Sequence, residues 1–144
     1  MKKRVVITGE GSISPLGHNT KSLWESLVKG NSGIDYISGF NTENFSVKIA
    51  GEVKSFEPIN FFDAKEARKL DRFTMFSLIA ASQALKSSNY NLSEAGVIVG
   101  TGVGGMHTLE EEHQKLLNKG QRGVSPFYVP KMIPNIAGGQ IAIK

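Results

Sequence analysis

The chain has 144 residues, of which 17 are Lys or Arg and 13 are Asp or Glu, so its formal net charge is +4. Hydrophobic residues make up 40% and charged residues 21%, an ordinary globular composition that excludes a disordered or collagen-like chain. The length suits one domain with a real core. No apolar run is long enough to cross a membrane, and the apolar stretch after the basic N-terminus is too short for a signal peptide. We therefore expect a cytoplasmic protein.

The sequence contains no cysteine, which excludes disulfides, thiolate metal sites and a cysteine nucleophile within these residues. Charge is also unevenly distributed, because no acidic residue follows Glu112 whereas five basic residues do. Such a basic C-terminal third suits an acidic partner, or acidic side chains that lie elsewhere in the fold.

In chain order, the first predicted element is a buried strand over 4–8, a run of β-branched residues. Thr20 is predicted to cap a helix over 21–29, which Gly30 ends. A weakly alternating segment over 47–53 is predicted to be a strand at a sheet edge or in an excursion.

The middle of the chain predicts a long helix that begins with a capping box, Asp63 with Glu66, and runs to about residue 87. The later predicted elements are an apolar strand over 95–100, a helix over 108–118, a kinked loop over 125–130, and a last helix that contains Gly138 and Gly139.

This order of elements predicts an α/β fold in which short apolar strands lie in a sheet covered by helices on both faces. Only two main strands are predicted, whereas such a sheet normally has about five. The sheet is therefore expected to be incomplete, and the chain to be the first part of a larger fold.

A glycine-rich segment follows the second predicted strand and matches G-x-G-x-x-G through Gly100, Gly102 and Gly105. A dinucleotide site also needs an acid about 20 residues further on, where this chain has Gly120. Three interpretations are open for the segment: a nucleotide-binding α/β module, a tight turn with close helix–strand contact, or a loop that moves.

The three histidines, His18, His107 and His113, lack the spacing of a metal site, and we expect no metal. No Ser-His-Asp arrangement can be argued either. The residues by themselves therefore point to no catalytic group.

Six motifs occur in order along the chain. They are Arg4-Val5-Val6-Ile7-Thr8-Gly9-x-Gly11-x-x-Ser14-Pro15-x-Gly17, Gly30-x-Ser32-Gly33-Ile34, Lys65-Glu66-x-Arg68-Lys69-x-Asp71-x-Phe73, Gly100-x-Gly102-Val103-Gly104-Gly105, Glu111-Glu112-His113 and Ser125-Pro126-Phe127-Tyr128-Val129-Pro130. Together they resemble the β-ketoacyl-acyl carrier protein synthases, most closely the elongating type, synthase II. Glu10 departs from the family pattern, which usually has an apolar residue there.

The resemblance implies the thiolase fold, with two similar α/β halves and a homodimer, and an acyltransferase activity in fatty acid biosynthesis. The reaction is the decarboxylative condensation of malonyl-acyl carrier protein with an acyl thioester. In this family the cysteine nucleophile lies shortly after the position of Lys144, and two catalytic histidines lie further on. Residues 1–144 thus correspond to the first part of the synthase N-terminal domain, contain no catalytic residue and are expected to be inactive alone. A non-catalytic chain-length-type subunit of the same family remains an alternative.

The resemblance also implies partners and site residues. Four basic residues match positions that dock the acidic acyl carrier protein: Lys65, Arg68, Lys69 and Arg122. Helical spacing independently predicts that the basic residues at 65, 68, 69 and 72 share one face. No cofactor is implied beyond the phosphopantetheine of the carrier protein, and neither nucleic acid nor membrane is expected as a partner.

The acyl pocket is the second implied site. Val103 resembles its gating residue, and the flanking glycines, including Gly102, would let such a gate move at low cost. Met106 would line the pocket with an adaptable side chain. Tyr128 matches an aromatic residue that reaches the pocket across the dimer interface.

Overall fold

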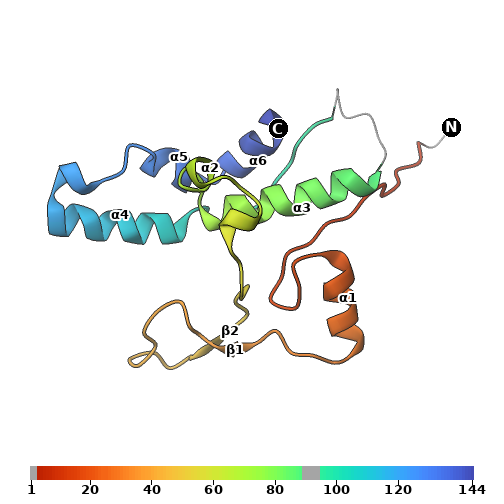
Figure 1. Ribbon diagram of the computed structural model, residues 1–144, viewed down its shortest axis with the longest axis horizontal. Coiled ribbons are helices and arrows are strands. Elements are labelled where there is room, and N and C mark those ends of the chain that lie inside the picture. The colour runs from red at the N-terminus through yellow and green to blue at the C-terminus, as the bar shows by residue number, and fades with distance from the viewer. Residues whose placement is uncertain (1–2, 89–94) are drawn as a thin grey trace. The chain divides into compact units, whose positions relative to one another are not determined.

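The computed structural model describes residues 3–88 and 95–144 (Figure 1). It divides into two compact units, one formed by Met1–Phe56 with Ile79–Tyr90 and the other by Glu57–Leu78 with Asn91–Lys144. None of the helices in the described ranges is long and apolar enough to cross a membrane.

In the first unit, α1 (Thr20–Val28) is fixed by a reciprocal capping box. The Oδ1 atom of Asn19 accepts a hydrogen bond from the Ser22 amide at 2.8 Å, and the Asn19 amide donates to Ser22 Oγ at 3.3 Å. The predicted cap, Thr20, was therefore one residue late, because Asn is the stronger capping residue and lies just before it. Gly30 ends the helix as predicted, with a φ of +70°.

A short antiparallel pair follows, in which β1 (Asp35–Tyr36) pairs with β2 (Ile49–Ala50). The predicted strand over 47–53 is thus confirmed only at its centre. A side chain also links the segments that follow these two strands, because one oxygen of the Glu52 carboxylate accepts from both the amide and the hydroxyl of Ser38 at 2.8 Å.

The two apolar runs predicted to be buried strands, 4–8 and 95–100, are not in a sheet in the described structure. Val5 is 96% exposed and Ile98 is 99% exposed. A buried strand needs neighbours for its backbone hydrogen bonds and a layer over its side chains. The apolar pattern indicates that these runs require burial. The described residues of each unit provide neither paired strands nor a covering layer for them.

Glycines bring the segment after the first of these runs against α3 (Arg72–Ser88). A Cβ atom on Gly9 would lie 2.1 Å from the carbonyl oxygen of Ala84, and one on Gly11 would lie 2.0 Å from that of Ala80. Neither position can hold a side chain without moving backbone. These glycines therefore serve backbone packing in the first unit.

In the second unit, the single helix predicted over 63–87 is two helices, α2 (Ala64–Ala67) and α3 (Arg72–Ser88). The break has a local cause, because the Oδ1 atom of Asp71 accepts from the Phe73 amide at 3.1 Å. A side chain that takes this amide acts as the N-cap of a new helix. Apolar periodicity alone did not reveal the break.

The remaining helices complete the second unit. Its buried apolar side chains are Phe62, Leu70, Met75, Leu78 and Ala137.

Pro130 is tolerated within the predicted kinked loop because it lies in the first turn of a short helix, where its missing N–H has no helical partner. Apart from the backbone of its own helix, no described atom lies within 4 Å of a Cβ built on Gly139, so no other backbone packs closely against this glycine. The elements are η1 (Pro58–Asn60), α4 (Met106–Lys119), η2 (Gln121–Gly123), α5 (Tyr128–Met132) and α6 (Ile136–Ile143).

Candidate functional site

The glycine-rich loop leads into the N-terminus of α4, and its amides already have protein acceptors. The Gly105 amide donates to the carbonyl of Met132 at 2.9 Å, and the Thr108 amide donates to Asp71 Oδ2 at 3.2 Å. The Met132 carbonyl and the Asp71 carboxylate thus take the two amides that a bound phosphate would otherwise receive. The geometry supports the interpretation as a tight, closely packed turn and gives no support to a nucleotide site.

The Asp71 carboxylate connects two helices of the second unit. It is 5% exposed, and Oδ1 accepts from the Phe73 amide of α3 at 3.1 Å. The other oxygen, Oδ2, accepts from the hydroxyl of Thr108 at 2.5 Å as well as from its amide. A Cβ atom on Gly105 would lie 2.9 Å from Oδ2, so the glycine makes room for the carboxylate. One negative charge therefore caps the N-termini of both α3 and α4, where the helix dipoles favour it.

Val103 and Met106 lie on either side of the turn that ends the loop. Val103 is 54% exposed and Met106 is 48% exposed, so the described part of the second unit does not enclose an acyl pocket around them. The turn itself is fixed at Gly104, which has a φ of +84° and whose Cβ would lie 2.5 Å from the carbonyl oxygen of Met132. Gly102 is exposed, and no described atom lies within 4 Å of a Cβ built there.

Tyr128, the first residue of α5, is half-buried and is held by a short chain of hydrogen bonds. Its amide donates to the Ser125 carbonyl at 3.0 Å, and the Ser125 amide donates to Glu112 Oε2 at 2.6 Å. Lys115 Nζ donates to the other carboxylate oxygen of Glu112 at 2.7 Å. The hydrogen bond from Lys115, followed by that from Ser125, holds the pKa of the buried Glu112 below its ordinary value.

Lys65, Arg68 and Lys69 are exposed and follow one another around α2 and the turn after it. The Lys69 ammonium lies over the ring of Phe127, 5.5 Å from the ring centre. Phe127 directly precedes α5, so the basic segment and the residue before Tyr128 are in contact. We call the three residues the α2 basic segment.

The prediction that a basic residue at 72 shares one helical face with this segment was wrong. Arg68 is the C-cap of α2, so the helix ends there. Arg72 begins α3 and its guanidinium lies over the ring of Phe76, 4.9 Å from the ring centre.

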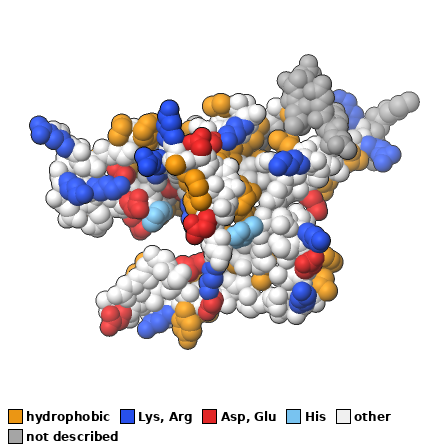
Figure 2. Space-filling view, in the orientation of Figure 1, with side chains coloured by type: hydrophobic (Ala, Val, Ile, Leu, Met, Phe, Trp, Pro, Cys, Tyr) orange, Lys and Arg blue, Asp and Glu red, His pale blue; other side chains and the backbone are white. Residues whose placement is uncertain are grey.

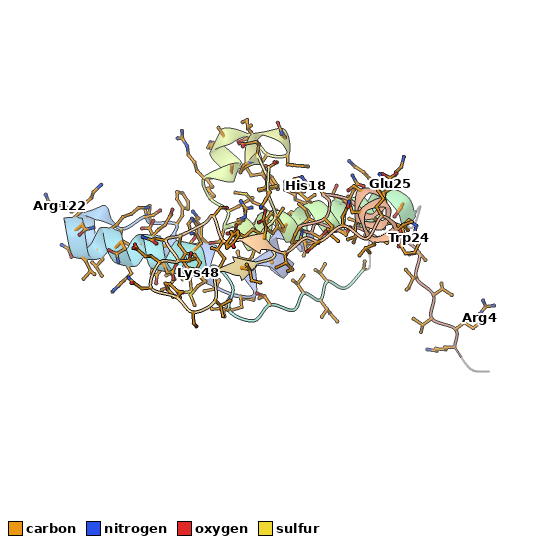
Figure 3. All side chains as sticks on the ribbon, turned by 90° about the horizontal axis from the view of Figure 1, so that it is seen from below. Arg4, His18, Trp24, Glu25, Lys48 and Arg122 are labelled. Carbon is orange, nitrogen blue, oxygen red and sulfur yellow. The ribbon has the colours of Figure 1, made fainter. Side chains whose placement is uncertain are left out.

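Arg122 is separated from the α2 basic segment. It lies in η2, directly after the C-terminal end of α4, where Figure 3 labels it and where further Lys and Arg side chains are visible in Figure 2. Three of the four residues matched to carrier docking therefore lie on one segment, and the fourth lies in a separate element, η2.

Two of the three histidines, His18 and His107, have protein partners. His18, labelled in Figure 3, places Nε2 2.9 Å from the Lys54 carbonyl and its ring edge against Phe56. His107 pairs with Glu111 at 3.2 Å along α4. Over residues 3–88 and 95–144, no group of three or more His, Asp or Glu side chains could hold a metal ion.

An open depression of about 720 Å³ lies in the first unit. Its lining includes Trp24, Gln83 and Lys86, and Trp24 is largely exposed. It contains none of the residues matched to carrier docking or to the acyl pocket, and it is not part of the candidate site.

Family comparison decides the identity of the chain. The family described as Beta-ketoacyl synthase, N-terminal domain, matches residues 2–144. The chain belongs to this family. It is 47% identical to the 3-oxoacyl-[acyl-carrier-protein] synthase 2 of Staphylococcus aureus (strain COL), an alignment that covers 98% of this chain and 35% of the relative. This β-ketoacyl synthase chain thus spans about a third of the length of that relative.

Solved structures agree on the fold. The ishigamide ketosynthase/chain length factor superimposes with a TM-score of 0.81 at 26% identity, over 96% of this chain and 36% of the other. A chain from the structure of a type II PKS acyl-carrier protein in complex with its ketosynthase superimposes with a TM-score of 0.77 at 24% identity, over 99% of this chain and 38% of the other. The β-ketoacyl synthase chain therefore has a partial α/β, thiolase-like fold, as expected, although the two runs predicted to be its main strands, 4–8 and 95–100, are not paired among the described residues.

Asp71, Glu112 and Phe127 lie within the family motifs, but none of them was among the predicted site residues. Asp71 carried a readable signal, because an acid directly before a long apolar-periodic helix is a capping residue. The roles of Glu112 and Phe127 depend on contacts with Ser125 and Lys69, which are distant in sequence.

The buried Glu112 carboxylate should make the free energy of unfolding depend on pH in the acidic range. Its pKa is lowered in the folded state from 4.5, so its contribution is full above the unfolded pKa and is lost as pH falls through the folded one. We expect Glu112→Gln to cost about 1–3 kcal/mol at pH 7, because buried acceptors are lost, and to flatten the fall in stability below the unfolded pKa. Urea midpoints between pH 7 and 3 measure this, with the exposed Glu110→Gln as the control. Parallel pH curves for wild type and Glu112→Gln would contradict the assignment.

Proposed function

We propose that the full-length protein that carries this chain is an elongating β-ketoacyl-acyl carrier protein synthase. It joins malonyl-acyl carrier protein to an acyl thioester, with loss of carbon dioxide, in fatty acid biosynthesis. The observation that carries the proposal is the 47% identity, over almost the whole chain, to a protein named 3-oxoacyl-[acyl-carrier-protein] synthase 2.

In this proposal the 144 residues bind and position substrates, and the reacting side chains lie elsewhere. The cysteine that accepts the acyl chain and the two histidines that assist decarboxylation are proposed to follow Lys144. This assignment fits the absence of cysteine from the sequence. The proposed enzyme is a homodimer, in which Tyr128 contributes to the pocket of the other subunit.

The α2 basic segment is the proposed docking site for acyl carrier protein. Its three cations are exposed, and acidic carrier surfaces are attracted to such clusters over a longer range than neutral surfaces. One of the structural neighbours is itself a ketosynthase in complex with an acyl-carrier protein. Arg122, which lies in η2, is proposed as a second contact.

The pocket assignment rests on the loop before α4. Val103 is proposed as the gate because it is flanked by Gly102 and Gly104, so that its backbone is less restricted than that of an ordinary loop residue. Met106 begins α4 beside it and is proposed to line the pocket.

The proposed function is tested by a condensation assay. The full-length protein should form β-ketoacyl-carrier protein from malonyl- and acyl-carrier protein, whereas the 144-residue chain should not accept a radiolabelled acyl group. Mass spectrometry of the carrier protein measures product formation, and the label retained on the chain measures acyl transfer. A full-length protein that binds carrier protein but makes no product would instead indicate the non-catalytic subunit of the same family.

Charge reversal should weaken docking mainly through slower association. Lys65→Glu with Arg68→Glu removes two attractions of roughly 0.2–1 kcal/mol each and adds repulsion. Binding kinetics at low and high salt measure the loss, which should shrink as salt screens the charges. The matched control is Lys29→Glu with Lys48→Glu, two exposed positions of the first unit that should leave association rates near those of wild type with the same net charge change. A loss independent of salt would show that the segment has a structural role.

A larger side chain at the gate should shorten the accepted acyl chain. Val103→Phe adds bulk to a closed pocket, and overpacking costs about 1–3 kcal/mol, which only long acyl chains would incur. Elongation of short and long acyl-carrier substrates, measured side by side, tests this. An equal loss at all lengths together with a lower melting temperature would show that Val103 is part of the core instead.

A further inference from the structure

The buried carboxylate of Asp71 has no part in docking or in the pocket as proposed above. It is 5% exposed, and its charge lies two residues after the α2 basic segment. Each of its hydrogen bonds goes to the start of a helix, with Phe73 for α3 and with Thr108 for α4. A group buried and satisfied in this way restricts the elements that it joins.

The loop over 101–105 has few other restraints. It contains three glycines, and a Cβ built on Gly102 would meet no described atom within 4 Å. Within the loop the Gly104 amide donates to Thr101 Oγ1 at 3.2 Å. Other elements hold the loop at its C-terminal end, where the Gly105 amide donates to the Met132 carbonyl and Thr108 donates twice to Asp71. The position of Val103 therefore depends on how firmly the start of α4 is fixed.

We propose that Asp71 is a positioning residue for acyl-chain selection, which fixes the start of α4 through Thr108 and thereby holds Val103 at one place. This inference rests on the proposed role of Val103 as the gate. Asp71 touches no substrate in this proposal, and its effect is transmitted by the loop.

Thr108 offers the sharper variant, because it can lose its hydroxyl without losing volume. Thr108→Val removes the hydroxyl hydrogen bond to Asp71, leaves the amide bond in place and keeps the branched shape, whereas Thr108→Ser keeps the hydroxyl. Thr74 provides the matched control, since it is equally buried in α3 and its hydroxyl has no hydrogen-bond partner among the described residues. Thr74→Val therefore makes the same chemical change where no bond is lost.

The first measurement is amide hydrogen exchange in the full-length protein. Thr108→Val and Asp71→Asn should speed exchange at Gly104, Gly105 and Met106 by roughly tenfold, as expected for loss of a hydrogen bond to a charged group. Exchange in the middle of α3 should change much less. Thr108→Ser and Thr74→Val should remain near wild type. This readout needs no enzymatic activity.

The second measurement is the ratio of kcat/KM for long and short acyl-carrier substrates. Thr108→Val should change this ratio by roughly tenfold. Thr108→Ser should keep the wild-type ratio, because serine retains the hydroxyl that donates to Asp71. A purely structural role would lower both values equally and leave the ratio unchanged.

The outcomes separate the two proposals. Unchanged exchange in the loop of Thr108→Val, or equally fast exchange throughout the second unit, would overturn the positioning role. Faster loop exchange with an unchanged substrate ratio would overturn the role in chain selection. Faster loop exchange in Thr108→Val, combined with a wild-type protein that has no condensation activity, would confirm the hold on the loop while refuting the proposed function.

Discussion

The sharing of one carboxylate between two helix N-termini organises the second unit. Asp71 ends the chain segment that contains α2, begins α3 and receives the start of α4. An N-terminus left without an acceptor in a buried place is unfavourable, because its amides lose water and gain nothing. The charge of Asp71 meets this requirement twice, and Gly105 is needed because any side chain there would collide with the carboxylate.

The same arrangement explains why the glycine-rich loop is not an anion site. In nucleotide-binding folds the free amides of a helix N-terminus receive a phosphate. Here an internal carboxylate and the Met132 carbonyl take those amides. Of the three glycines that match G-x-G-x-x-G, only Gly105 approaches another backbone closely, so the chemistry of the segment depends on what occupies the helix end.

Both proposed substrate-binding regions are adjacent to this carboxylate. The α2 basic segment precedes Asp71 along the chain and contacts the residue before α5 through Lys69 and Phe127. Glu112 fixes the loop before the same helix by accepting from the Ser125 amide. Two buried acids therefore hold the elements that carry the proposed docking and pocket residues, while the cations themselves stay exposed.

The sequence by itself determined the family, the α/β class, the position of α1 to within one residue, and the start of α2, because these depend on motifs, local capping and periodicity. Apolar periodicity did not show the break between α2 and α3, because the break depends on the local bond from the Phe73 amide to Asp71, and the second bond of Asp71, to Thr108, joins residues 37 positions apart. It also placed two buried strands whose neighbours are not among the described residues, because an apolar run reports the need for burial but not what provides it. Only the tertiary structure placed Lys65, Arg68 and Lys69 on one segment and Arg122 in a separate element, η2, because the contact of Lys69 with Phe127 joins residues that are distant in sequence.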